Sequence, residues 1–151
     1  MLDKGLVKPY MYLMDSPQPS VATTHKKPVR SFEDLMIWQM GIELVKRLYV
    51  LTASGSVSRD FGYRDQIRKA AVSIPSNIAE GFERSSRKEY LNFLNIAKGS
   101  AGEVRSLLRV GVEVGYLETE VYESLRIDLM KLSAYMFNHI RSIKAAPVRK
   151  I

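Results

Sequence analysis

Residues 66–81 read Gln-Ile-Arg-Lys-Ala-Ala-Val-Ser-Ile-Pro-Ser-Asn-Ile-Ala-Glu-Gly, and this stretch decides the fold. Its apolar residues recur at helical spacing on one face, which predicts an amphipathic helix. These are Ile67, Ala70, Ala71, Ile74 and Ile78. Pro75 interrupts the pattern, lacks an N–H group and should kink the helix, freeing the carbonyl four residues earlier. We expect Ser73, Ser76 or Asn77 to satisfy that carbonyl.

A line of polar residues runs beside this apolar face. Its members follow one another at intervals of seven, four and three residues, and they are Gln66, Ser73, Asn77 and Glu80. One interpretation is a kinked packing helix in which the polar groups repair the kink. The other is a polar seam that takes part in subunit or ligand contacts.

The longer stretch QIRKAAVSIPSNIAEGFERSSRKEYLNFLNIAKGSAGEV resembles the signature of the 23S rRNA-intervening-sequence protein family. The upstream FEDLMIWQMGIELVKRLYVLT and the downstream VGVEVGYLETEVYESLRIDLMKLSAYM are similar to the same family, so the likeness covers roughly Phe32 to Ile143. The resemblance implies an all-α, up-down four-helix bundle that assembles as a ring-shaped homopentamer. Some relatives are accessory proteins of reverse transcriptases in diversity-generating retroelements, which implies a possible reverse transcriptase partner.

Composition restricts the class of protein. A chain of 151 residues with 46% hydrophobic residues has the size and composition of one globular domain. It has no run of about 18 apolar residues and no secretory signal at its first residues, so we expect no membrane association. The chain has no cysteine, which excludes disulfides and thiolate metal sites and fits a reducing cytoplasm.

The charge balance indicates the kind of partner. The formal net charge is +7 at pH 7, which favours polyanions such as RNA or DNA. A ring of identical basic subunits would strengthen that field.

The chain divides into three parts: an extended arm over 1–30, a bundle over 31–146 and a basic tail over 147–151. Four of the six prolines lie in the arm, so no helical period survives there. The arm also carries an apolar patch, Tyr10–Met14. Either the arm is an ill-ordered leader, or it docks on a neighbouring subunit or a partner protein.

Four helices are expected within the bundle, over about 31–52, 60–79, 87–114 and 119–143. Ser31 with Asp34 and Ser86 with Glu89 have the form of capping boxes at the first and third helix. Gly81 is expected to end the second helix, and Thr119 is expected to cap the fourth.

The third expected helix is apolar over an arc of about 160°, whereas one bundle interface needs about 100°. Gly99 and Gly102 would permit close approach of another backbone, at a cost of about 1 kcal/mol each in helix stability. We therefore predict that this helix also faces another subunit. The predicted packing and subunit-contact residues are Gln66, Ser73, Pro75, Asn77, Glu80, Ile96, Gly99, Gly102 and Leu107.

Cations at helical spacing form the predicted nucleic-acid site. One group lies on the second helix, a second at the start of the third helix beside its N–H groups, and a third along the third helix. They are Arg64, Arg68, Lys69, Arg84, Arg87, Lys88, Lys98, Arg105 and Arg109. The alternative is that these cations are ordinary solvated side chains. If the edges of two helices face the same way, the second and third helices would present one basic line.

No catalytic constellation is evident in the sequence. His25 and His139 have no metal-ligand spacing to another histidine or a carboxylate, and a buried Glu80 near Asn77 lacks a nucleophile. We expect no enzyme activity, no metal and no cofactor. The predicted function is a nucleic-acid-binding accessory or scaffold protein, with RNA or DNA held through its phosphates. The alternative is a protein-interaction hub without nucleic acid.

Overall fold

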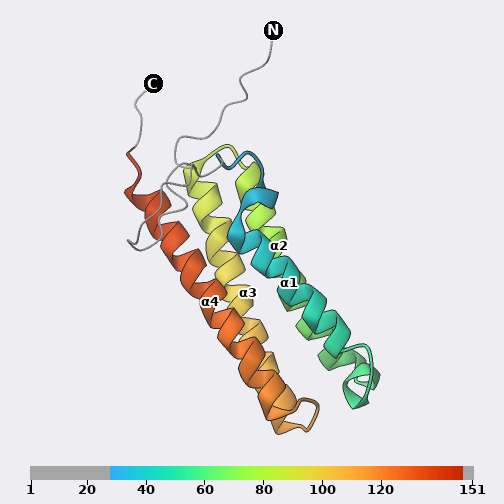
Figure 1. Ribbon diagram of the computed structural model, residues 1–151. Helices are drawn as coiled ribbons and strands as arrows, with labels where there is room; N and C mark the ends of the chain where they lie inside the picture. The colour runs from blue at the N-terminus through green and yellow to red at the C-terminus, as the bar shows by residue number, and fades with distance from the viewer. Residues whose placement is uncertain (1–27, 148–151) are drawn as a thin grey trace.

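The computed structural model describes residues 28–147, and its helices form an up-down four-helix bundle (Figure 1). This confirms the predicted all-α fold. In chain order the elements are η2 (Phe32–Asp34), α1 (Met36–Leu51), η3 (Ser56–Arg59), α2 (Phe61–Glu83), α3 (Arg87–Glu113) and α4 (Thr119–Ala145). The predicted roles of the Tyr10–Met14 patch and of the last four residues fall outside the described part.

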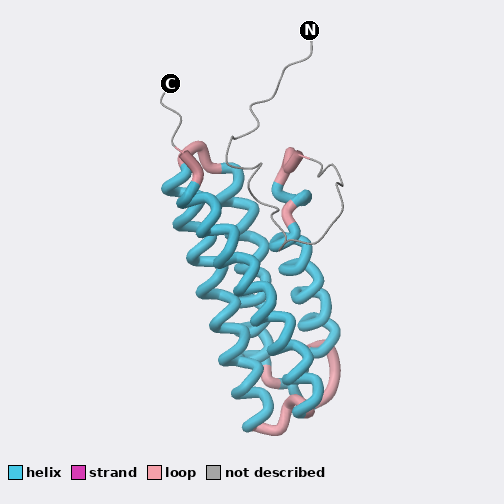
Figure 2. Tube along the Cα trace, turned by 60° about the vertical axis from the view of Figure 1, so that its left-hand side comes forward, coloured by secondary structure: helices cyan, strands magenta, loops and turns pink. Residues whose placement is uncertain are grey.

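All four long helices contribute to one apolar core, in which α2, α3 and α4 are the largest contributors. Side chains that are fully or almost fully buried include Leu48, Ile67, Ile74, Leu94, Leu108, Leu129 and Met136. Figure 2 shows the helices running side by side, with both described termini at one end of the bundle. The core therefore follows the length of the bundle. The side chains that can contact a partner lie on the outer faces of the helices, along the contacts between them or at the ends of the bundle.

The first helix begins later than predicted. Asp34 Oδ2 accepts a hydrogen bond from the Ser31 N–H at 3.2 Å, as the capping pattern requires. The turn that it caps is a short 3₁₀ helix, because the extended backbone of Leu35 separates it from α1. The turn places the Phe32 ring 5.4 Å from the Trp38 ring, edge to face, at the end of the core.

Pro75 lies within a continuous α2 and is buried. A Cβ added to Gly41 on α1 would lie 3.3 Å from Pro75 Cδ, so the absence of a side chain there admits the proline ring. Asn77 Nδ2 donates to the Ser73 carbonyl at 2.7 Å. The Ser73 carbonyl is not the one that Pro75 frees, and within the described residues neither Ser73, Ser76 nor Asn77 forms the predicted side-chain bond to the Ala71 carbonyl.

Two predicted helix ends are wrong. Gly81 lies inside α2, which continues to Glu83. Its lack of a side chain serves packing, since an added Cβ would lie 2.6 Å from Phe93 Cβ on α3. At α4, the N-cap residue is Glu118, and Thr119 is already the first helical residue.

Candidate nucleic-acid interface

Cations on α3 lean across onto α4. Lys98 Nζ lies 5.3 Å from the centre of the Phe137 ring, and Arg109 Cζ lies 6.0 Å from that of Tyr122. Arg105 lies between them in the sequence, seven residues from Lys98, and is exposed. The predicted line of cations on α3 therefore follows the edge that faces α4.

The edge of α4 that faces α3 carries further cations. Tyr122 and Phe137 mark this edge because both contact α3 cations. Residues three, four or seven positions further along a helix lie on the same side. By this spacing the edge also carries Arg126, Arg141 and Lys144. We call the combined surface the basic face: Lys98, Arg105, Arg109, Arg126, Arg141 and Lys144.

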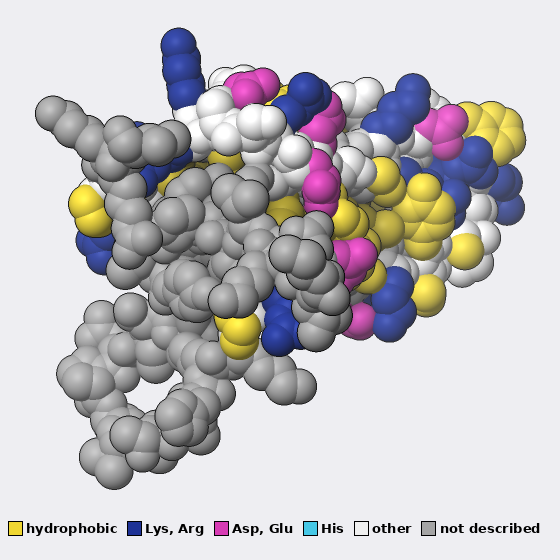
Figure 3. Space-filling model, turned by 90° about the horizontal axis from the view of Figure 1, so that it is seen from above, with side chains coloured by type: hydrophobic (Ala, Val, Ile, Leu, Met, Phe, Trp, Pro, Cys, Tyr) yellow, Lys and Arg dark blue, Asp and Glu magenta, His cyan; other side chains and the backbone are white. Residues whose placement is uncertain are grey.

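Acidic side chains neutralise part of the basic face. Arg109 pairs with Glu113 one turn away, and Arg126 Nε lies 3.0 Å from Glu123 Oε2. Within residues 28–147, Arg105 makes no hydrogen bond or ion pair, and the face keeps an excess of positive charge. Figure 3 shows cationic and acidic side chains interspersed on the part of the surface that is visible from above.

The three α4 cations on this face are not among the residues predicted for the nucleic-acid site. Arg141 and Lys144 follow Arg126 by 15 and 18 residues, a spacing that keeps all three on one side of a helix. That signal was present in the sequence.

The cations predicted on α2 turn the other way. Arg68 Nε donates to Thr52 Oγ1 at 2.7 Å, and its guanidinium lies over the Tyr49 ring, so this side chain binds the end of α1. Arg64 Nη1 donates to the Ser58 carbonyl at 3.2 Å. Because Arg64 and Arg68 face the α1 side, they do not join the α3 cations in one line on a single chain. Lys69 is exposed on α2.

The cations at the start of α3 are also mostly engaged. Arg87 Nη1 donates to the Ala146 carbonyl at 2.7 Å, which joins the start of α3 to the end of α4. Arg84 Nη2 lies 2.5 Å from Glu80 Oε1 and its guanidinium lies over Phe93. Lys88 is exposed, and its side chain makes no hydrogen bond or ion pair within the described part. The predicted phosphate site at this helix start is therefore reduced to one cation directed to solvent.

The polar line on α2 contacts α3 of the same chain. Ser73 Oγ lies 2.9 Å from Ser100 Oγ, and Ser100 Oγ donates to the Ile96 carbonyl at 3.1 Å. Gln66 Nε2 donates to Glu103 Oε1 at 2.7 Å. These bonds favour the interpretation of the line as helix packing, and Glu80 is exposed and paired with Arg84.

An apolar strip lies outside the α2–α3 contact. Ile96, Val110 and Val114 on α3 are 43%, 43% and 54% exposed, and Leu107 is half-buried. No atom lies within 4 Å of the Cβ positions of Gly99 and Gly102, apart from those of their own helix backbone and neighbours. Most of the wide apolar arc predicted for this helix is thus buried in the core, and its outer edge at Ile96 and Val114 is exposed on a single chain.

A hydrogen-bonded cluster joins the two loops at the end opposite the termini. Tyr116 OH donates to Asp60 Oδ2 at 2.7 Å, and Tyr63 OH donates to the Leu107 carbonyl at 2.6 Å. Hydrogen bonds from the Tyr63 N–H and from Tyr116 lower the pKa of Asp60, and burial raises the pKa of Tyr63 to about 12. Both groups are thereby held in their ordinary charge states at neutral pH, which is typical of a structural cluster.

Two further features bear on the class of protein. Residues 28–147 contain no group of three or more His, Asp or Glu side chains arranged to hold a metal ion. Over the same residues, no helix combines the length and the apolar character needed to span a bilayer.

Comparisons with known proteins agree with this architecture. Residues 33–138 match the family model described as 23S rRNA-intervening sequence protein. Among solved structures, the chain is similar to a protein of unknown function from the S23 ribosomal protein family of Bacteroides thetaiotaomicron VPI-5482. The two share 26% identity with a TM-score of 0.64, over 70% of this chain and 99% of the other. No curated protein matches the chain.

Neither the family description nor that of the similar structure names an enzymatic activity. The family model covers most of the chain, including the Pro75 stretch and the basic face as far as Arg126. The chain therefore belongs to the 23S rRNA-intervening sequence protein family.

Proposed function

We propose that this protein is a non-enzymatic, cytoplasmic accessory or scaffold that binds nucleic acid through the basic face. The observation that carries the proposal is that Lys98 and Arg109 both lean onto α4, which joins the cations of two helices into one surface. Arginine and lysine on a helical surface contact phosphates without reading bases. Affinity is therefore expected to depend steeply on salt and weakly on sequence.

A titration with a structured RNA at about 50 mM and about 200 mM salt tests this proposal. We expect Arg105→Glu with Arg141→Glu to weaken binding by on the order of tenfold or more and to reduce the salt dependence. The matched control, Arg59→Glu with Lys131→Glu, changes the net charge equally at exposed positions outside the basic face. Equal losses in both variants would assign binding to net charge alone, and no loss in either would exclude the basic face.

Assembly as a ring-shaped homopentamer is the second part of the proposal. The exposed apolar strip of Ile96, Val110 and Val114 supports a subunit contact on the outer α2–α3 surface, and the number five comes from the family resemblance. Light scattering of the wild type should give the pentamer mass. Val110→Glu should lower that mass, and a monomeric wild type would contradict the proposal.

A retroelement reverse transcriptase is the partner enzyme that we propose, on the family resemblance alone. A ring with repeated basic faces would hold RNA, DNA or an RNA–DNA hybrid beside such an enzyme. The competing function is a protein-interaction hub, which the same exposed apolar strip favours. Co-purification with the polymerase that persists after nuclease treatment, together with no binding in the RNA titration, would favour the hub.

A further inference from the structure

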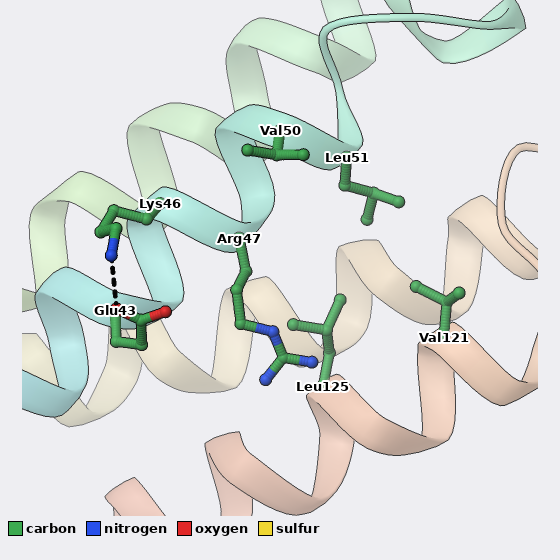
Figure 4. A pocket seen from close by; sticks show the side chains of 7 residues that line it. All are labelled: Glu43, Lys46, Arg47, Val50, Leu51, Val121 and Leu125. Carbon is green, nitrogen blue, oxygen red and sulfur yellow. Dashed lines mark hydrogen bonds and ion pairs between the residues drawn. The ribbon is translucent and has the colours of Figure 1, made fainter.

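The contact between α1 and α4 leaves an apolar groove, which consists of two adjoining hollows of about 360 and 230 Å³. The apolar residues that line the larger hollow are Val50, Leu51, Val121 and Leu125, and Glu43, Lys46 and Arg47 line it as well. The smaller one is lined by Met40, Leu44 and Leu132. Figure 4 shows the larger hollow, with Arg47 extending from α1 toward α4 and Leu125 and Val121 on the α4 side.

Arg47 separates the two hollows. Its guanidinium crosses from α1, forms an ion pair with Asp128 on α4 and donates to Ser124 Oγ at 3.0 Å. Apolar surface remains open to solvent beyond this bridge, since Val50 is 75% exposed. The groove is thus mostly apolar, with the Arg47 bridge across it and the Glu43–Lys46 ion pair among its lining residues, and its apolar part suits a short apolar peptide segment.

We propose that the chain's own segment Tyr10–Met14 docks in this groove. These five residues form the apolar patch of the arm that precedes the bundle. Their tether makes docking intramolecular, so a high effective concentration offsets part of the ordering cost. The proposal is independent of nucleic-acid binding, because the groove and the basic face lie on different edges of α4.

The residues between the Tyr10–Met14 patch and the bundle are numerous enough for the patch to reach the groove. Fourteen residues lie between Met14 and Val29, and an extended chain of that length reaches about 45 Å. The path along α1 from its first residue to Val50 is only about 21 Å at 1.5 Å per residue.

The patch also matches the length of the groove. Leu44 and Leu51 belong to different hollows and are separated by about 10 Å along α1. In an extended chain, Tyr10 and Met14 lie about 13 Å apart. One extended segment can therefore place an apolar side chain in each hollow and pass the Arg47 bridge between them.

Engineered cysteines test the proposal cleanly because the natural chain has none. In the full chain we expect Leu13→Cys with Val50→Cys to form an intrachain disulfide under mild oxidation. The matched control is Leu13→Cys with Ile127→Cys, which places the second thiol at an exposed position of α4 outside the groove. The groove pair should react on the order of tenfold faster than the control. Equal rates, or no intrachain product, would overturn the proposal.

The products identify the occupant. A disulfide-linked dimer in place of the intrachain product would show that another copy's arm fills the groove, and this would also overturn the proposal. Hydrogen exchange provides a measurement without cysteines. Leu13→Ser with Met14→Ser should speed exchange over 40–51 and 121–132 and leave α2 unchanged. Unchanged exchange over both ranges would contradict docking.

Discussion

Helix α4 meets its two neighbours in different ways. Toward α3 it buries a polar contact, in which Tyr90 OH lies 2.8 Å from His139 Nε2 and His139 is 6% exposed. Toward α1 its polar contact is the Arg47–Asp128 pair, whose side chains are 36% and 44% exposed beside an open groove. Buried polar groups are costly when a partner is lost, whereas exposed ion pairs contribute little. The α3–α4 contact should therefore contribute more to the free energy of unfolding than the α1–α4 contact does. The α1–α4 contact can then bind another segment at little cost in stability.

The α2–α3 contact is also closely packed. We call the α2–α3 and α3–α4 contacts the closed side of the molecule, and the α1–α4 contact with its groove the open side. At the α2–α3 contact the helices approach closely at Gly81, and small hydroxyl groups at Ser73 and Ser100 hydrogen-bond across the interface. Four predictions test how far the closed and the open sides differ in energy, in order of expected effect.

The largest effect is expected from pH at the closed side. Burial lowers the pKa of His139 to about 4, from the ordinary value of 6.5. The unfolded chain therefore takes up a proton below about pH 6.5 that the folded chain takes up only near pH 4. The free energy of unfolding should be unaffected by His139 above pH 6.5 and should fall by about 3 kcal/mol as the pH drops to 4.

Urea unfolding at several pH values checks this, with His139→Gln as the comparison. Glutamine retains a group that can hydrogen-bond to Tyr90 and does not titrate. The wild type should lose more stability than the variant between pH 6.5 and 5, where most carboxylates are still ionised. Parallel pH profiles would mean that His139 is not buried as a neutral ring.

The second prediction compares two glycines. Gly81→Ala should destabilise the fold by about 2 kcal/mol, because the added methyl group meets Phe93 Cβ at 2.6 Å and α2 must shift from α3. Gly99→Ala adds the same group where no atom outside the local helix lies within 4 Å, and it should stabilise the monomer by up to about 1 kcal/mol. Thermal unfolding measures both. Similar changes at the two positions would contradict a close α2–α3 approach.

The sequence predicted the helices far better than the directions of their side chains. The number of helices and the box at Ser86, where Ser86 Oγ accepts from the Glu89 N–H at 3.2 Å, follow from local patterns. Gly81 was misread as a helix end because a C-cap and a close helix crossing both select glycine. The distinction depends on Phe93 and Tyr90 of the next helix, which local spacing does not reveal.

The candidate site shows the same limit of local reasoning. Helical spacing groups Lys98 with Arg105 and Arg68 with Arg64, but it does not say which neighbouring helix each pair faces. That depends on how the bundle closes: Arg68 reaches Thr52 on the α1 side, whereas Lys98 reaches Phe137 on α4. A single line of cations over two helices was therefore beyond what spacing could establish.

The third prediction tests the hydroxyl bridge of the closed side. Ser73→Ala removes the contacts with Ser100 Oγ and with Asn77 Nδ2, each at 2.9 Å. The expected cost is about 1 kcal/mol, since each partner keeps a backbone carbonyl as a second acceptor. Ser76→Ala, at an exposed position on the same helix, should be neutral or slightly stabilising. Urea unfolding with equal m-values separates the two, and a larger loss for Ser76→Ala would contradict the bridge.

The smallest effect is expected on the open side. Arg47→Met removes the ion pair with Asp128, and an exposed pair of this kind contributes at most about 1 kcal/mol. A double-mutant cycle with Asp128→Asn measures the coupling, and a value above about 2 kcal/mol would mean that the α1–α4 side is as closed as the others. Methionine at this position also removes the charged bridge between the two hollows and adds apolar surface to the groove. If Tyr10–Met14 docks there, Arg47→Met should therefore destabilise the full chain less than it destabilises the chain carrying Leu13→Ser and Met14→Ser. Equal changes in the free energy of unfolding in both backgrounds would contradict docking of Tyr10–Met14 in the groove.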